Sequence, residues 1–212
     1  MGLLSGEQRP AWRVSDFEIK KSDSRPRMND YFEAAPPLRA TVAQNLFRLV
    51  LQFQGYLLCE REVSLIKSDL GCHLLMHYMI QRALGHLHIP ADLFIKHGEF
   101  AAQYQFRHLD WPHHVRLLCP DRVTLKHYLI EELRGDDSQH YSTACLFALV
   151  PQWLDFLVTQ QLLEPAQRNQ TLLDLFEVHE DLYGTLLQYT RNLHLAKSLI
   201  GWPWQQTRPP QI

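Results

Sequence analysis

Apolar residues recur every three or four positions from Thr41 to about Ile200, and this spacing is the feature that most limits the fold. Thr41 can cap a first helix that runs to about Leu58. The apolar residues of this helix form one broad stripe: Val42, Leu46, Leu49, Val50, Phe53 and Leu57. Helical spacing over so much of the chain predicts a mainly α protein, built as a helical bundle.

Capping and helix-breaking residues divide the rest of the chain into further helices. Pro90 stops the second helix, and Pro151 predicts a kink or a break inside a later one. The further predicted helices cover residues 68–88, a short piece after Asp110, a segment from Asp121 or Thr124 to Gly135, residues 136–163 and residues 171–200.

The first forty residues differ from the rest, because they are rich in charge, Ser and Pro. They contain one short strand candidate, "WRVSDFEIKK", at residues 12–21. We therefore expect an extended N-terminal segment over 1–40, a helical domain over 41–201 and a C-terminal tail over 202–212.

The formal net charge of −2 supplies no basic field, which argues against a nucleic-acid partner. No apolar run approaches the roughly 20 residues that cross a bilayer, so we expect no membrane association. The four cysteines are spread widely without a C-x-x-C pair, which favours free thiols and a reducing, cytoplasmic compartment.

The segment "GCHLLMHYMIQRALGHLH", residues 71–88, gathers four histidines in one predicted helix. His73 and His77 are four residues apart, so both point to one side and could share a zinc ion. A zinc site needs further ligands, and the sequence identifies none beside this pair. The helix is apolar nearly all round, which predicts that it is buried. We therefore expect no bound transition metal, and histidines that form hydrogen bonds in or beside the core.

Arg82 and His88 in the same segment have the R-x₅-H spacing. This pair resembles the R-x₄₋₆-H motif of the all-helical HEPN ribonucleases. The resemblance implies that Arg82 stabilises a phosphoryl transition state and that His88 transfers a proton. Ala83 follows the arginine, where those enzymes usually carry a polar residue.

Residues 12–88 resemble the latter part of the lincosamide- and aminoglycoside-type nucleotidyltransferases. The similar stretches are "WRVSDFEIKK", "MNDYFEAAP" and "NLFRLVLQFQGYLLCEREVSLIKSDLGCHLLMHYMIQRAL". The resemblance implies that Asp16 is the carboxylate of the last catalytic strand and helps to hold magnesium. The family's G-S…D-x-D element is absent here, so the chain would be a reduced or split relative whose partner chain brings the phosphate loop.

Two hypotheses follow. The first is a helical binding or interaction module, with another protein chain or a small molecule as partner and no cofactor unless the resemblance brings magnesium. The alternative is a self-sufficient helical enzyme. Such an enzyme would use either a metal held by His73 and His77 or the ribonuclease pair Arg82 and His88.

Overall fold

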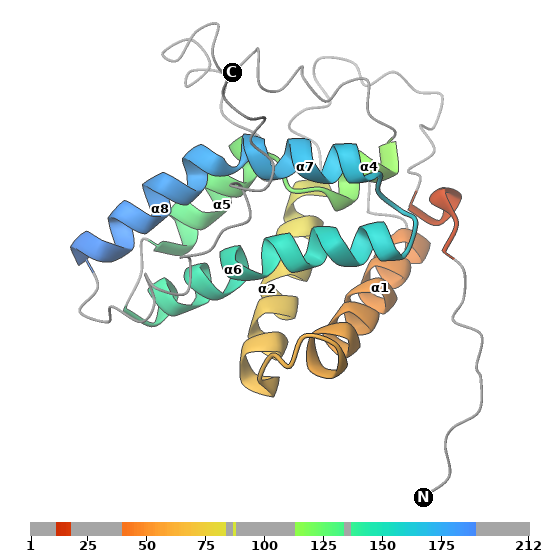
Figure 1. Ribbon diagram of the computed structural model, residues 1–212, viewed down its shortest axis with the longest axis horizontal. Helices are drawn as coiled ribbons and strands as arrows, with labels where there is room; N and C mark the ends of the chain where they lie inside the picture. Colours follow the sequence, from red (N-terminus) through yellow and green to blue (C-terminus); the bar gives the residue numbers. More distant parts are fainter. Residues whose placement is uncertain (1–11, 18–39, 84–86, 88–112, 134–136, 190–212) are drawn as a thin grey trace, which may run out of the picture.

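The computed structural model describes residues 12–17, 40–83, 87, 113–133 and 137–189, and this part of the chain is mostly helical (Figure 1). Its elements are η1 (Val14–Phe17), α1 (Ala40–Cys59), α2 (Leu65–Ala83), α4 (His113–Leu118), α5 (Arg122–Leu133), α6 (Asp137–Thr159), α7 (Pro165–Asp174) and α8 (Phe176–Tyr189). The described residues contain no strand. The predicted mainly α fold class is therefore confirmed.

Helices α1 and α2 form a helical hairpin, with α1 at the lower right of the helical body and α2 near its centre (Figure 1). All six residues of the stripe predicted for α1 are buried, so that prediction is confirmed. The turn between the helices is closed where Val63 N–H donates to the Leu57 carbonyl at 3.0 Å. Glu62 in this turn has a φ of 53°, a left-handed conformation that lets the chain reverse within a few residues.

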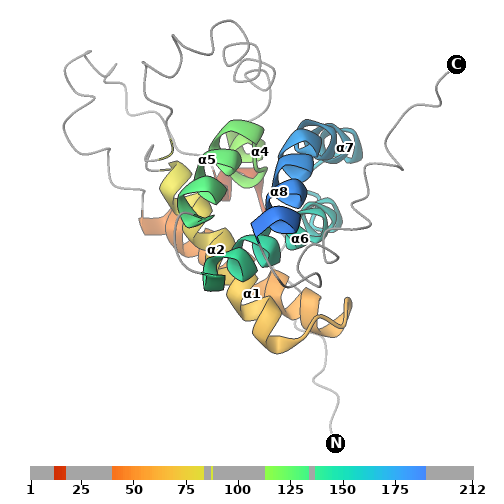
Figure 2. The ribbon, with the colours of Figure 1, turned by 90° about the vertical axis from the view of Figure 1, so that its left-hand side faces the viewer.

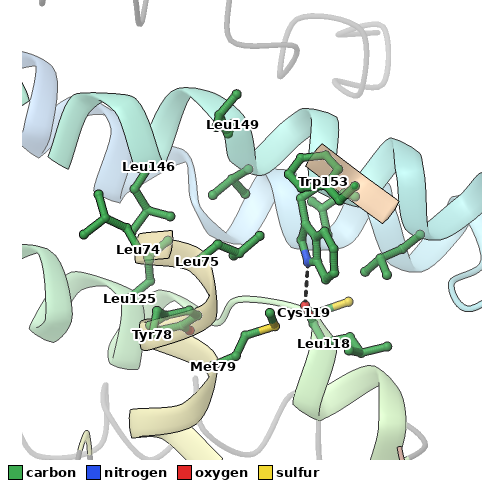
Figure 3. Packing of buried hydrophobic residues seen from close by; sticks show 14 of the residues in the cluster. Leu74, Leu75, Tyr78, Met79, Leu118, Cys119, Leu125, Leu146, Leu149 and Trp153 are labelled. Carbon is green, nitrogen blue, oxygen red and sulfur yellow. Dashed lines mark hydrogen bonds between the residues drawn. The ribbon is translucent and has the colours of Figure 1, made fainter. Parts of the chain in front are cut away.

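Helix α6 is the central element, since α1, α2, α5, α7 and α8 all pack against it (Figure 2). Trp153 of α6 is fully buried, with its ring centroid 5.1 Å from that of Phe53. Its Nε1–H donates to the Leu118 carbonyl at 2.8 Å (Figure 3). Pro151 lies inside the helix, which continues through it to Thr159.

Residues His140–Thr159 of α6 are long and apolar enough to cross a membrane by length and composition alone, so the statement that no apolar run approaches this length is wrong for α6. Most of this stretch is buried inside the protein, as expected of the core helix of a helical bundle. Because packing in the core explains the apolar character of this stretch, its length and composition are only weak evidence for a membrane span.

Helix α2 also lies centrally, between α1, α4, α5 and α6. Its buried face carries Leu74, Leu75, Tyr78 and Met79 (Figure 3). His73 and His77 are exposed, so the helix that was predicted to be buried is buried on most of its faces but not on the one that carries these histidines. The helix also begins at Leu65, before the predicted start at Ser68. The Ser68 backbone N–H already donates to the Ser64 carbonyl at 2.9 Å, so Ser68 lies within the first turn.

The strand predicted around Asp16 is wrong for the residues that the structure describes there, because Val14–Phe17 is a 3₁₀ turn. The Asp16 carboxylate accepts the Arg13 backbone N–H at 2.9 Å, and the Asp16 N–H donates back to the Arg13 carbonyl at 2.9 Å. Such a local bond offers the backbone an alternative to a strand ladder. Phe17 anchors the turn in the core.

The single helix predicted over residues 171–200 is also wrong, because α7 ends at Asp174 and α8 begins at Phe176. Helix α7 begins at Pro165, which is suited to the first helical position, after a reciprocal capping box between Glu164 and Gln167. The break falls at Leu175, which is fully buried. Residues 190–200 and the predicted tail, 202–212, lie outside the described residues.

Candidate functional site

The guanidinium group of Arg82 is held in place at the end of α2. Its Nη2 lies 3.0 Å from Oδ2 of Asp121, and its Nη1 donates to the Cys119 carbonyl. Both partners belong to the connection between α4 and α5. The charge of Arg82 is therefore matched by a carboxylate and a carbonyl from one neighbouring segment.

Asp121 has a second role as the N-cap of α5. Its Oδ1 accepts the Thr124 backbone N–H at 2.9 Å, and its Oδ2 accepts the Thr124 hydroxyl at 2.6 Å. The Thr124 hydroxyl is also within 2.8 Å of the Tyr78 hydroxyl. The polar cluster of Tyr78, Arg82, Asp121 and Thr124 thus fastens α2 to the start of α5.

The ionisation of this cluster supports a structural role. Burial alone would lower the pKa of the Arg82 guanidinium, but the neighbouring Tyr78 and Asp121 raise it by more. Burial acts to raise the pKa of the Asp121 carboxyl, and Arg82 and the bonds from Thr124 lower it overall. Burial raises the pKa of Tyr78 to about 12. Arg82 and Asp121 form a charged pair that already satisfies both groups, and His88 lies outside the described residues.

The two histidines proposed as metal ligands lie on the exposed face of α2. Nδ1 of His77 is 2.9 Å from the Tyr128 hydroxyl, and its Nε2 is 3.1 Å from Nε2 of Gln81. Within the described residues, no group of three or more His, Cys, Asp or Glu side chains is placed to hold a metal ion. His77 instead links α2 to α5.

Asp16, the carboxylate that the nucleotidyltransferase resemblance places on a strand, lies in the η1 turn. Its carboxylate accepts the Arg13 N–H, and its backbone carbonyl accepts Nδ2 of Asn45 from α1 at 2.9 Å. Nearby, Nε1–H of Trp12 donates to Oε1 of Gln52 at 2.6 Å. These bonds attach the N-terminal turn to α1.

A different surface stands out on the outer face of α1. Phe47, Leu51 and Leu58 are 54%, 49% and 37% exposed. Their spacing of four and seven residues aligns them on one face of the helix, opposite its core side. We call these three residues the α1 stripe. Leu65 and Ile66, at the start of α2, are also exposed.

A groove of about 260 Å³ lies beside the stripe, between α1 and α6. It is lined by Gln52, Gly55, Tyr56, Cys59, Glu60, Phe156 and Gln160. A Cβ added at Gly55 would meet nothing within 4 Å, so the helix surface is open there. The rings of Tyr56 and Phe156, 5.5 Å apart, give the groove an apolar wall. Stripe and groove together form the apolar surface of the described α1.

Sequence reasoning missed this surface, although α1 carries a signal for it. The predicted core stripe used six apolar positions, and Phe47, Leu51 and Leu58 were left over outside it. Apolar residues therefore occupy two faces of α1, and only one of these faces is needed for packing against the core.

The comparisons with known proteins add no neighbour to this picture. No family model, no curated protein and no solved structure matches the chain.

Proposed function

We propose that this chain is a helical interaction module that binds another protein through the α1 stripe and the groove beside it. The observation that carries the proposal is the run of large apolar side chains exposed on α1 and at the start of α2. Of the eight large exposed hydrophobic residues in the described part of the chain, five lie on this hairpin: Phe47, Leu51, Leu58, Leu65 and Ile66.

Exposed apolar area of this kind favours association. Full burial of a Leu or Phe side chain contributes roughly 1.5–3 kcal/mol, so half-exposed side chains gain a substantial part of that when a partner covers them. Contiguous apolar patches on a monomer surface often mark binding sites for proteins. The groove of about 260 Å³ is smaller than the roughly 300–1,000 Å³ of typical small-molecule sites, which favours a protein partner.

The polar cluster at Arg82 does not favour the enzyme alternative, because its charges are already engaged with one another. Kinship with the helical half of nucleotidyltransferases stays a prediction. It is compatible with an interaction module, since a split relative would work through a partner chain.

The test compares two single changes in cells that naturally produce the chain. Leu51→Gln removes one member of the α1 stripe, and Leu187→Gln changes a leucine of almost equal exposure on α8, 45% against 49%. We expect the wild-type chain and Leu187→Gln to elute from native extract in a complex larger than one chain, and Leu51→Gln to elute at the size of a free chain.

Elution of the wild-type chain as a free monomer in native extract would contradict the proposal. So would a complex that persists unchanged in Leu51→Gln and in the double variant Phe47→Gln with Leu51→Gln. Circular dichroism of each purified variant controls for loss of helix.

A further inference from the structure

We infer that residues 8–11 of this chain, "QRPA", bind in the groove between α1 and α6 and compete there with a partner protein. The binding of this segment follows from contacts within the chain itself. Its role as a competitor rests on the proposed function, because the groove is part of the surface proposed for the partner.

The chain runs along α1 in the direction opposite to the helix, beginning at Trp12, the first described residue (Figure 1). Nε1–H of Trp12 donates to Oε1 of Gln52 at 2.6 Å, and the carbonyl of Asp16 accepts Nδ2 of Asn45 at 2.9 Å. From Trp12 to Asp16 the chain therefore moves from the level of Gln52 to that of Asn45, toward the amino end of α1. The same path, followed back from Trp12, leads toward the carboxyl end of α1.

The groove lies on this part of α1. It starts at Gln52, the same residue that binds Trp12. Its other α1 residues follow toward the carboxyl end of the helix: Gly55, Tyr56, Cys59 and Glu60. Positions 45, 52 and 59 are seven residues apart, about two turns, so the groove and the contacts of the N-terminal turn share one face of α1. Residues that precede Trp12 can therefore enter the groove without a reversal of the chain.

The sequence before Trp12 favours an extended segment of suitable length. Pro10 fixes its own φ near −65° and biases Arg9 toward extended backbone. Such a segment advances about 3.1–3.3 Å per residue, whereas a helix rises about 1.5 Å per residue. Counted from Trp12 at the level of Gln52, Pro10 reaches about the level of Tyr56, and Arg9 about that of Cys59.

The groove has an apolar wall at the level that Pro10 reaches. The rings of Tyr56 and Phe156 form this wall, with their centroids 5.5 Å apart. Grooves lined by aromatic rings bind extended segments that contain proline, because proline brings an apolar ring and has no N–H to leave unpaired. An added Cβ at Gly55 would meet nothing within 4 Å, so a bound backbone can approach α1 closely there.

The far end of the groove has the charge opposite to that of Arg9. Glu60 lines this end and is exposed. A single ion pair at the surface stabilises only modestly, so the segment binds weakly and leaves the groove readily. Cys59, beside Glu60, is the exposed cysteine of the four and therefore stays more reactive than the three buried thiols. It can report whether the segment is bound.

The first experiment measures how fast a disulfide forms between Cys59 and a new thiol in the full-length chain. Gln8→Cys places this thiol next to Arg9, at the end of the groove that Cys59 lines. Gly55→Gln, added to this chain, fills the floor of the groove below Pro10. We expect it to slow disulfide formation at least fivefold in dilute, mildly oxidising buffer.

Gly184→Gln is the matched control for Gly55→Gln, because Gly184 is also a helical glycine whose added Cβ would meet nothing within 4 Å. We expect it to leave the rate of disulfide formation unchanged. Neither substitution should unfold the chain, since both place a better helix former in open space, and circular dichroism checks this.

The charge contact is tested in the same Gln8→Cys chain. We expect Arg9→Glu to slow disulfide formation about threefold, and Arg9→Glu combined with Glu60→Arg to restore the rate. The reaction of Cys59 with a small neutral disulfide reagent, measured in each variant without Gln8→Cys, corrects for changes in the thiol itself. Rates that neither Gly55→Gln nor Arg9→Glu lowers would show that the segment lies outside the groove, and would overturn the inference.

The second experiment tests competition with the partner. In the purified Gln8→Cys chain, a short bismaleimide joins position 8 to Cys59, and the control chain has both thiols blocked separately. Each is added to native extract from which the chain's own copy has been removed. We expect the control chain to enter the larger complex and the joined chain to stay free. An equal share of complex for both would show that the segment does not compete. Failure of the proposed function looks different: the wild-type chain is then free in native extract, while the disulfide rates still decide whether the segment occupies the groove.

Discussion

At the scale of single residues, the most demanding contact is the ion pair between Arg82 and Asp121. The two side chains are 17% and 25% exposed, so both charges are largely removed from water and depend on each other and on nearby hydrogen bonds. Asp121 supplies the opposite charge to Arg82 and also caps the start of α5. One carboxylate therefore stabilises both the end of α2 and the start of α5.

Asp121→Asn separates these two roles, because asparagine keeps an N-cap oxygen and loses the charge. We expect the variant to lower the free energy of unfolding by about 1–3 kcal/mol at pH 7, since Arg82 then keeps a charge without its carboxylate partner. Urea unfolding followed by circular dichroism measures this change.

The pH dependence of this difference in the free energy of unfolding tests whether the charge of Asp121 is its cause. The pKa of Asp121 is lowered in the folded protein, so its contribution to stability is complete above the ordinary Asp pKa of about 3.9. That contribution is lost as the pH falls through the lowered value. The wild-type chain should therefore keep its full advantage over Asp121→Asn from pH 7 to about 4 and begin to lose it between about pH 4 and 3. A difference that stays constant over this range would show that the charge is not its source.

The cysteines give a second prediction at this scale. Burial raises the pKa of the Cys72 and Cys119 thiols to about 12 and that of Cys145 to about 11, whereas Cys59 is exposed. The reactive form of cysteine is the thiolate, so we expect a thiol reagent to modify one equivalent of the native chain quickly at pH 8. Cys59→Ser should abolish the fast reaction. Fast modification of two or more thiols in the native chain would contradict the prediction.

At the scale of helices and turns, the sequence predicted the features that depend on residues close together in the chain. The bounds of α1 follow from its apolar spacing, and the start of α5 follows from Asp121, whose cap is formed within four residues. The turn at Asp16 was missed because its local bonds with Arg13 compete with the strand pattern. The break at Leu175 was missed because the burial of this residue depends on the packing of several helices. The pairing of Arg82 with Asp121 was also invisible, since nothing in the spacing of two residues so far apart brings them together.

The contact between α2 and α6 depends on a glycine. A Cβ at Gly71 would lie 2.1 Å from Cδ1 of Leu149 and 3.3 Å from its Cγ, with Sγ of Cys145 at 3.5 Å. Relief of the overlap requires the buried Leu149 side chain to change its rotamer and its Cγ to shift slightly within the packed core. We expect Gly71→Ala to destabilise the fold by about 1–3 kcal/mol, as for other insertions into a packed core.

Gly184→Ala is the control for the intrinsic helix preference of alanine. Its added methyl group would meet nothing within 4 Å, so we expect a gain in stability of up to about 1 kcal/mol. Urea midpoints of the two variants against the wild-type chain measure both effects. Equal shifts in the two variants would mean that α2 and α6 do not approach as closely as Gly71 and Leu149 indicate.

At the scale of the whole molecule, the buried residues of the described helices form one cluster that extends from Phe17 to Leu186. Helix α6 contributes to it along most of its length and contacts five other helices. The sequence predicted the α1 members of this cluster through their apolar spacing. It could not predict that α1 would keep three more apolar residues outside the cluster, because exposure is decided by which helices cover which faces.

A single cluster predicts a single unfolding transition for the helical body. The buried thiols report on it from different places: Cys72 in α2, Cys119 after α4 and Cys145 in α6. In a Cys59→Ser chain, brief labelling with a thiol reagent at increasing urea concentrations measures the exposure of each buried thiol by mass spectrometry. We expect all three to become reactive at one midpoint, and this midpoint should match the loss of helical circular dichroism. A thiol that reacts at clearly lower urea than the others would mean that its helix leaves the body first, and that the described helices do not unfold as one unit.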